Sequence, residues 1–292
     1  MKVLVVFALI VAGVAAYDAL PNTAYGYIQN IAIPLAEEIR KVEEANSAQR
    51  IVGGSPSQLG QFPYQAGLLS RYQGLSGTGV CGGSLVTENR VITAAHCWND
   101  GVNQAYITTV VLGSVNLFTG GTRQDTSAVI MHPNWIPLLV RNDVAIIYLP
   151  TSVSFSSTIA PISLPSGSEI NENFAGASAV ASGFGLTQNG KFNYGSISVA
   201  QFLSHVQLNI ISNVVCTVAF PLYLRDSNIC TSGIGGTSTC RGDSGGPLVV
   251  TRNNRQILVG ITSFGSPLGC QAGMPAAYAR VTSFLDFFNQ HL

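Results

Sequence analysis

A glycine-rich run, Gly242–Pro247 (GDSGGP), holds one serine on a tight turn, and its surroundings restrict the fold. Glycine accepts a positive φ and lets the main chain approach a ligand closely, so Ser244 can expose its hydroxyl there. The apolar runs Pro247–Thr251 and Gln256–Ile261 follow, separated by a two-asparagine turn, which predicts strand, turn, strand. A serine elbow of the G-x-S-x-G type needs a helix after the serine. The sequence therefore predicts that Ser244 belongs to a β-rich fold.

A hydroxyl nucleophile needs a general base beside it and N–H donors for the oxyanion that forms. The only histidine after Ser244 is His291, one residue from the C-terminus, so we look for the base upstream. His96 follows an apolar β-branched run, and Asp143 opens another. The candidates thus occur in the order histidine, aspartate, serine. For the glycine-rich motif in isolation, the alternative is an ordinary turn whose serine is satisfied locally.

This order and the motifs that carry it, TAAHC around His96, NDVAII around Asp143 and GDSGGP around Ser244, resemble the secreted chymotrypsin-like serine endopeptidases. The resemblance covers about residues 51–292 and is greatest to the digestive chymotrypsins of insects. It implies that Ser244 attacks the peptide carbonyl, that His96 is the general base, and that Asp143 orients the imidazole. It also implies an oxyanion hole formed by the N–H groups of Gly242 and Ser244.

The strand pattern and the resemblance imply the same fold class. Short β-type runs with turns fill both halves of the chain, and no alternation of strands with helices appears. We expect an all-β protein with two six-stranded antiparallel β-barrels, the trypsin-like serine protease fold, and the site between them. Apolar residues from Val281 to Phe288 recur at helical spacing, and Ser283 with Asp286 matches a capping box, so a short C-terminal helix is expected.

Two segments are expected to precede the catalytic domain. Residues 1–16 carry a lysine, an apolar run and a small-residue end, which is typical of a signal peptide and too short to span a bilayer. Residues 17–50 are expected to be an activation propeptide, and residues 51–292 the catalytic domain. Within the propeptide, Ile33–Glu44 has helical spacing, which we interpret as a weakly helical, disposable segment. The alternative is that this segment masks the surface of the zymogen. We expect a soluble, secreted protein that acts in the gut lumen.

Arg50 precedes a β-type run that begins at Ile51, and beside the other motifs this pair resembles the family's activation site. The resemblance implies that a trypsin-like protease cuts after Arg50. The new ammonium group of Ile51 would then form a buried ion pair with Asp243, and breaking such a pair costs about 3–5 kcal/mol. The chain is therefore expected to be a zymogen. Asp243 as an ordinary turn residue is the alternative.

Six cysteines occur, and an even number in an exported chain favours disulfides over a metal site. Counting alone leaves about 15 pairings open. The resemblance implies the sequential pairing, in which each bridge fixes a loop beside a catalytic or pocket residue: Cys81–Cys97, Cys216–Cys230 and Cys240–Cys270.

The resemblance also implies which residues line the specificity pocket. Ser238 lies six residues before the serine nucleophile, at the pocket base, where a trypsin-like enzyme has an aspartate, so cleavage after lysine or arginine is not expected. The other substrate-binding residues that it implies are Ser263, Phe264, Gly265, Ala276 and Arg241. Ala276 stands where glycine is usual, and one methyl changes discrimination by about 1–3 kcal/mol. We expect cleavage after Phe, Tyr, Leu or Met. Elastase-like or collagenase-like specificity and a non-catalytic homologue are the alternatives.

Charge and donor spacing argue against several other partners. From residue 51 onward, ten basic and nine acidic side chains leave a net charge of +1, which gives no electrostatic case for nucleic acid or an anionic membrane. His132, His205 and His291 have no second ligand at metal spacing, and Leu112–Leu117, where the family's calcium loop would lie, has no acid. We expect no metal and no cofactor. The expected partners of a monomer are protein and peptide substrates, the activating protease and protein protease inhibitors.

Overall fold

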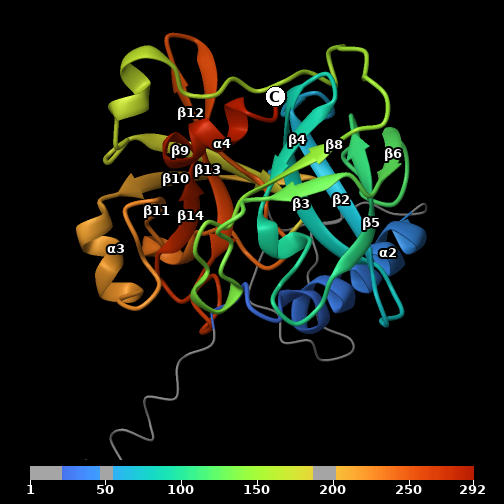
Figure 1. The fold of residues 1–292 in the computed structure, drawn as a ribbon, viewed down its shortest axis with the longest axis horizontal. Coiled ribbons are helices and arrows are strands. Elements are labelled where there is room, and N and C mark those ends of the chain that lie inside the picture. Colours follow the sequence, from blue (N-terminus) through green and yellow to red (C-terminus); the bar gives the residue numbers. More distant parts are fainter. Residues whose placement is uncertain (1–21, 47–54, 187–201) are drawn as a thin grey trace, which may run out of the picture.

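The computed structural model describes residues 22–46, 55–186 and 202–292. The expected signal peptide therefore lies outside the described residues, as do Arg50 and Ile51. Two antiparallel sheets stand side by side, and the helical segment that precedes them in the sequence lies against the first sheet (Figure 1). Among the described residues, no helix combines the length and apolar character that crossing a bilayer requires.

The first sheet has seven strands in the order β6-β5-β2-β3-β4-β8-β7. Its two end strands do not pair with each other in the described structure, so the sheet is an open half-barrel. One end is β6, whose polar residues include the exposed Asp125, and a charged edge of this kind discourages further pairing. The strands are β2 Gln65–Tyr72, β3 Gly79–Thr87, β4 Arg90–Thr93, β5 Ala105–Leu112, β6 Thr122–Thr126, β7 Val129–Met131 and β8 Ala145–Tyr148.

The second sheet closes on itself. Its order is β1-β10-β11-β14-β13-β12-β9, and the additional pairing of β10 with β9 makes a six-stranded barrel to which the short β1 is added. The strands are β1 Ser55–Pro56, β9 Ser178–Gly183, β10 Ser204–Ile211, β11 Asn228–Thr231, β12 Pro247–Arg252, β13 Arg255–Phe264 and β14 Ala276–Arg280.

The structure confirms the all-β, trypsin-like fold class with a short C-terminal helix. The six-stranded barrel is observed for the second half only, because the first half gains an edge strand and stays open. The expected two-asparagine turn joins β12 to β13, with φ of 48° at Asn253 and 62° at Asn254. Both residues therefore adopt the left-handed conformation that a two-residue hairpin turn of type I′ requires.

Several helices accompany the sheets. The expected helix at Ile33–Glu44 is observed as α2, Ile33–Asn46, preceded by one π-helical turn, η1, Ile28–Ala32. In α3, Asn213–Ala219, the side chain of Ser212 caps the first turn by accepting a bond from the N–H of Val215. The remaining helices are short: η2 Ala95–Cys97, η3 Pro137–Leu139, η4 Gly167–Asn171, η5 Ile234–Gly236, η6 Val281–Phe284 and α4 Leu285–Asn289.

The capping box expected at Ser283 is wrong. The C-terminal helical segment already begins at Val281, as the turn η6, so Ser283 lies inside it, and no side chain caps either η6 or α4. Burial fixes this segment instead. Phe287 and Phe288 of α4 belong to the same apolar core as the first sheet, and His132 packs against Phe287.

The apolar core is also continuous with the segment before the sheets. Leu35 and Ile39 of α2 are completely or almost completely buried and belong to the cluster that includes Leu68 of β2 and Leu85 of β3. The segment is therefore part of the apolar core of the intact chain, and its removal on activation stays a prediction. Three disulfides join Cys81 to Cys97, Cys216 to Cys230 and Cys240 to Cys270, the pairing that the resemblance implies.

We predict that Phe288→Ala lowers the free energy of unfolding by about 3–5 kcal/mol, because the side chain is fully buried and its removal leaves a cavity. Urea denaturation followed by fluorescence measures this. Phe155→Ala is the matched control, since Phe155 is 52% exposed, and it should change stability by less than about 1 kcal/mol. Equal losses for the two variants would contradict the packing of α4.

Candidate active site

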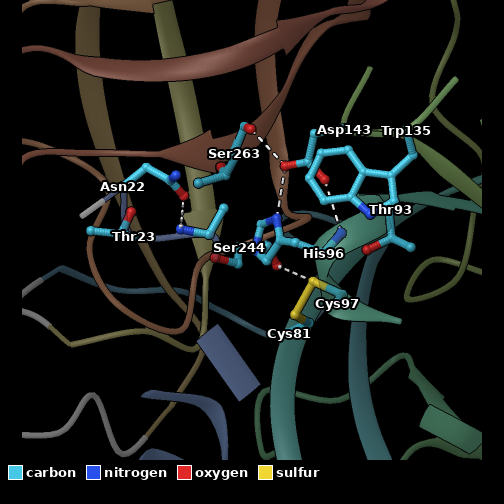
Figure 2. A network of polar contacts seen from close by, with 12 residues as sticks. Asn22, Thr23, Cys81, Thr93, His96, Cys97, Trp135, Asp143, Ser244 and Ser263 are labelled. Carbon is cyan, nitrogen blue, oxygen red and sulfur yellow. Dashed lines mark hydrogen bonds and ion pairs between the residues drawn. A yellow bond between two sulfur atoms is a disulfide. The ribbon is translucent and has the colours of Figure 1, made fainter. Parts of the chain in front are cut away.

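The residues that the sequence singled out come together where the two sheets meet. The backbone N–H of Gly82 in β3 donates to the backbone O of Ser244 at 2.7 Å, which joins the first sheet to the serine turn. Figure 2 shows His96, Asp143, Ser244 and Ser263 converging at this junction. The site is thus built from both halves of the molecule.

His96 and Asp143 form a buried pair. His96 lies on η2, directly after β4, and Asp143 precedes β8, after Asn142 in the left-handed conformation with φ of 59°. The Nδ1 atom of His96 lies 2.7 Å from Oδ2 of Asp143, and the backbone N–H of His96 donates to Oδ1 at 2.9 Å. Because the carboxylate holds Nδ1, the histidine presents Nε2 to the cleft.

Ser263 of β13 completes this arrangement. Its Oγ donates to Oδ2 of Asp143 at 2.6 Å, so the carboxylate accepts bonds from both halves of the molecule (Figure 2). Sequence reasoning assigned Ser263 to the pocket wall only. No local pattern marks it as a partner of Asp143, because the two residues are 120 positions apart and meet only through the docking of the sheets.

Ser244 stands on a turn that only glycines allow. Gly242 has φ of 99° and Gly245 has φ of 79°. A Cβ atom at Gly245 would lie 2.5 Å from the backbone O of Gly82, so a side chain there would push the two sheets apart. Ser244 is 8% exposed. In the described structure, Nε2 of His96 is buried and has no hydrogen-bond partner.

The expected pocket lies beside the serine as a cavity of about 50 Å³. Ala276 does not line it, since it is buried within β14, opposite Thr231 of β11. Ala276 is therefore the one predicted substrate-binding residue that does not line this cavity. Those that do line the cavity are Ser238, Arg241, Ser263, Phe264 and Gly265.

Part of the cavity wall comes from residues that were not among the predicted pocket residues. Thr23, Tyr27 and Ile31, from the segment expected to be the propeptide, line the cavity together with the pocket residues. The ring of Tyr27 packs edge-on against the His96 ring, with 4.9 Å between centroids. Helical spacing had identified α2, but nothing local to the sequence indicated which surface its apolar side would cover.

Asp243 lies behind the serine turn, on the wall of a wider cavity of about 640 Å³. Its carboxylate accepts bonds from the backbone N–H of Cys240 at 2.8 Å and of Gly185 at 2.9 Å. The described residues supply no salt bridge to it, and burial raises the pKa of Asp243 to about 6. A carboxylate in such surroundings favours a cationic partner.

The described residues include one group with metal-ligand atoms close together, formed by Cys81, His96 and Cys97. Both cysteines are joined in a disulfide, so neither offers a thiolate. This group is therefore explained by the disulfide beside the histidine rather than by a metal site.

Comparison with known proteins identifies relatives over the same region. The family described as Trypsin matches residues 51–288. The collagenase of Hypoderma lineatum is 36% identical over 243 residues, which cover 83% of this chain and 87% of the relative. Serine protease 1 of Drosophila melanogaster is 38% identical over 244 residues, covering 83% and 85%. The solved structure of HL collagenase superimposes with a TM-score of 0.72 at 35% identity, covering 82% of this chain and 97% of that one.

The pKa of Asp243 predicts how stability depends on pH. In the uncleaved chain the folded carboxyl group titrates near pH 6, against 3.8 for the ordinary group, so the folded state holds a proton that the unfolded state releases. Its contribution is fully present below about pH 4 and lost as the pH rises through about 6, by roughly 2–3 kcal/mol. Urea unfolding of the uncleaved protein and of Asp243→Asn at pH 4 and pH 7 measures the difference. A difference in stability between the two proteins that does not change with pH would contradict this assignment.

Proposed function

The chain belongs to the trypsin family of serine proteases and is a serine endopeptidase, and we propose that His96, Asp143 and Ser244 form its catalytic triad. The observation that carries this proposal is the buried His96–Asp143 pair, with the carboxylate on Nδ1 and the free Nε2 facing the side of Ser244. A histidine held in this way is arranged to accept a proton at Nε2.

Each step of peptide hydrolysis then has a group to perform it. The Ser244 hydroxyl attacks the carbonyl carbon while His96 takes its proton at Nε2, and the same proton passes to the leaving amine. Asp143 stabilises the imidazolium that forms between these transfers. Water then attacks the acyl enzyme, with His96 again as the base. The backbone N–H groups of Gly242 and Ser244 stabilise the oxyanion, and losing one such donor typically costs about 10²–10³ in turnover.

The chain is made as a zymogen in this proposal. A trypsin-like protease cuts after Arg50, and the ammonium group of Ile51 enters the cavity behind the serine turn to pair with Asp243. The size of that cavity and the raised pKa of a carboxylate without a salt bridge among the described residues support this assignment. The pocket in the uncleaved chain holds about 50 Å³, whereas an apolar cavity that takes benzene has about 150 Å³. Activation is therefore expected to enlarge it.

The preferred substrates are peptides with a large hydrophobic residue, Phe, Tyr, Leu or Met, before the cut bond. Ser238 lines the pocket without a charge, which disfavours basic side chains, and the pocket otherwise takes apolar groups between Phe264 and the Cys240–Cys270 bridge. Collagenase-like specificity is the second candidate, and the relative from Hypoderma lineatum that bears this name favours it.

The place of action in this proposal is outside the cell, in the gut lumen, where the protease digests protein. Three disulfides within a domain of this size are typical of an oxidising, extracellular environment. The N-terminal leader pattern supports export. The enzyme is expected to act as a monomer and to be a target of protein protease inhibitors.

We predict that, in protein cut after Arg50 and separated from its propeptide, Ser244→Ala lowers kcat by about 10⁶, because the nucleophile is removed while the pocket remains. Hydrolysis of a peptide anilide ending in phenylalanine measures this. Ser238→Ala is the control that keeps the triad, and it should lose far less. Undiminished hydrolysis by the Ser244→Ala variant would contradict the assignment of Ser244 as the nucleophile.

A second prediction concerns specificity. Among peptide substrates that end in Phe, Leu, Ala or Arg, the activated enzyme should have its highest kcat/KM on Phe or Leu, and Ser238→Asp should raise the relative rate on Arg. The added carboxylate supplies the charge partner that a basic side chain needs inside the pocket. A preference for Ala would favour an elastase-like pocket, and a wild-type preference for Arg would contradict the proposed specificity.

A further inference from the structure

The segment 22–46 covers the cleft with an amphipathic helix, whose apolar face is turned toward the protein. Ile28, Leu35 and Ile39 are buried in the core that they share with the first sheet. On the opposite face of α2, Glu37 and Arg40 are exposed and form an ion pair three residues apart. The helix thus has one face built for this surface and one face built for solvent.

One end of the segment occupies the strand edge that would receive a substrate. The backbone N–H of Gly265 donates to Oγ1 of Thr23 at 3.0 Å. Ala24 is fully buried in a cluster with Phe264 and Val140. Thr23 lines the same cavity as Ser244 and Ser263, and Figure 2 shows it with Asn22 in this part of the site. A peptide substrate could not pair with this edge while the segment is there.

Tyr27 occupies the centre of the site. Its hydroxyl donates to the backbone O of Val80 at 3.0 Å, and its side chain is 2% exposed. Burial raises the pKa of this phenol above its usual range, and hydrogen bonding from the Ser244 hydroxyl and from the Gly242 N–H offsets part of the rise. The phenolic oxygen therefore lies against the groups that a substrate carbonyl would use.

Two further contacts hold the helix on this surface. Leu35 packs so closely on Gly242 that a Cβ atom there would lie 2.4 Å from its Cδ2. At the far end, the carboxylate of Glu43 accepts bonds from the backbone N–H groups of Leu117 at 2.6 Å and Phe118 at 2.9 Å. The segment is thus fixed at the serine turn and on a loop of the first half.

The backbone of the segment does not present a bond for cleavage. Substrates bind proteases of this kind as extended strands that pair with the enzyme. At Tyr27, φ is −55° and ψ is −42°, so the chain is already helical where the reacting carbonyl would lie. Asp100 holds this bend, since Oδ2 accepts a bond from the N–H of Ile28 at 2.7 Å. The segment is built to occupy the site without reacting in it.

Cleavage after Arg50 does not touch these contacts, because α2 ends at Asn46 and β1 begins at Ser55. We propose that the cleft is a docking surface for an amphipathic helix led by a tyrosine, and that residues 22–46 stay on it as a competitive inhibitor after the cut. The proposal rests on the function assigned to Ser244. Activation then takes two events, the cut after Arg50 and the release of the segment.

Binding can be measured without activity. Ser244→Ala protein, cut after Arg50 and freed of its propeptide by chromatography in mild urea, is titrated into a fluorescently labelled 22–46 peptide, and anisotropy is recorded. Saturable binding with a Kd below about 100 μM is expected, and Tyr27→Ala in the peptide should weaken it about 30-fold or more. Tyr25→Ala is the matched control, because Tyr25 is 40% exposed and should change Kd less than about threefold.

Activity gives the second arm. Added to the freed wild-type enzyme, the 22–46 peptide should raise KM for a small substrate, leave kcat unchanged, and be recovered uncut by mass spectrometry. Tyr27→Phe keeps the ring against His96 but removes the hydroxyl, and it should inhibit less well than the unchanged peptide. The peptide carries Arg40→Gln and Lys41→Gln, which remove two sites at which trypsin left over from activation would cut it. Any cleavage that is observed then comes from the enzyme under test.

The binding assay and the activity assay together distinguish the inhibitor proposal for residues 22–46 from the proposed protease function. An active enzyme with no peptide binding, or with rapid hydrolysis of the peptide, overturns the inhibitor and leaves the protease assignment standing. Saturable, Tyr27-dependent binding to a freed protein that hydrolyses nothing supports the docking surface and contradicts the proposed function. Equal losses from Tyr27→Ala and Tyr25→Ala would overturn the placement of Tyr27 at the centre of the interface.

Discussion

The buried carboxylate of Asp143 is the interaction on which the site depends. A carboxylate removed from water must be compensated by hydrogen bonds, and here these come from His96 of the first half and Ser263 of the second. The geometry of the histidine is therefore set by the docking of two sheets rather than by either one. The bond from Gly82 to Ser244 fixes the same junction from the other side. A change that separates the sheets would disturb the base and the nucleophile together.

Local chemistry in the sequence predicted the elements around the site, and the resemblance to a known family predicted which side chains belong to it. Glycines around Ser244, the asparagine pair at the β12–β13 turn and the apolar runs beside His96 and Asp143 each constrain a few neighbouring residues, and the structure contains the elements they predict. Features that depend on distant packing were not predictable in this way. The role of Ser263 at Asp143 and the open first sheet are of this kind. The capping box failed because burial of the phenylalanines fixes the C-terminal segment without a cap.

The segment 22–46 also shows that contacts between distant parts of the chain could not be predicted from local sequence. Its helical spacing predicted α2, but an apolar helix face indicates only that something covers it. The structure identifies that partner as the cleft, with Leu35 on Gly242 and Tyr27 on His96. The glycine needed for the serine turn also leaves the space that Leu35 fills, so one backbone requirement serves both the nucleophile and its cover. Thr23, Tyr27 and Ile31 of the segment thereby line the same pocket as Ser238.

Labelling with a fluorophosphonate probe tests the central claim most directly, namely that Ser244 is the activated nucleophile and that residues 22–46 cover it. Attack by the serine oxygen forms an O–P bond, expels fluoride and passes the hydroxyl proton to His96. The labelled position is read by peptide mass spectrometry, before cleavage and after the propeptide is removed. The account predicts modification at Ser244 in the freed enzyme and at least about tenfold slower labelling in the intact chain. Labelling at another residue, or equal rates in the two forms, would contradict it.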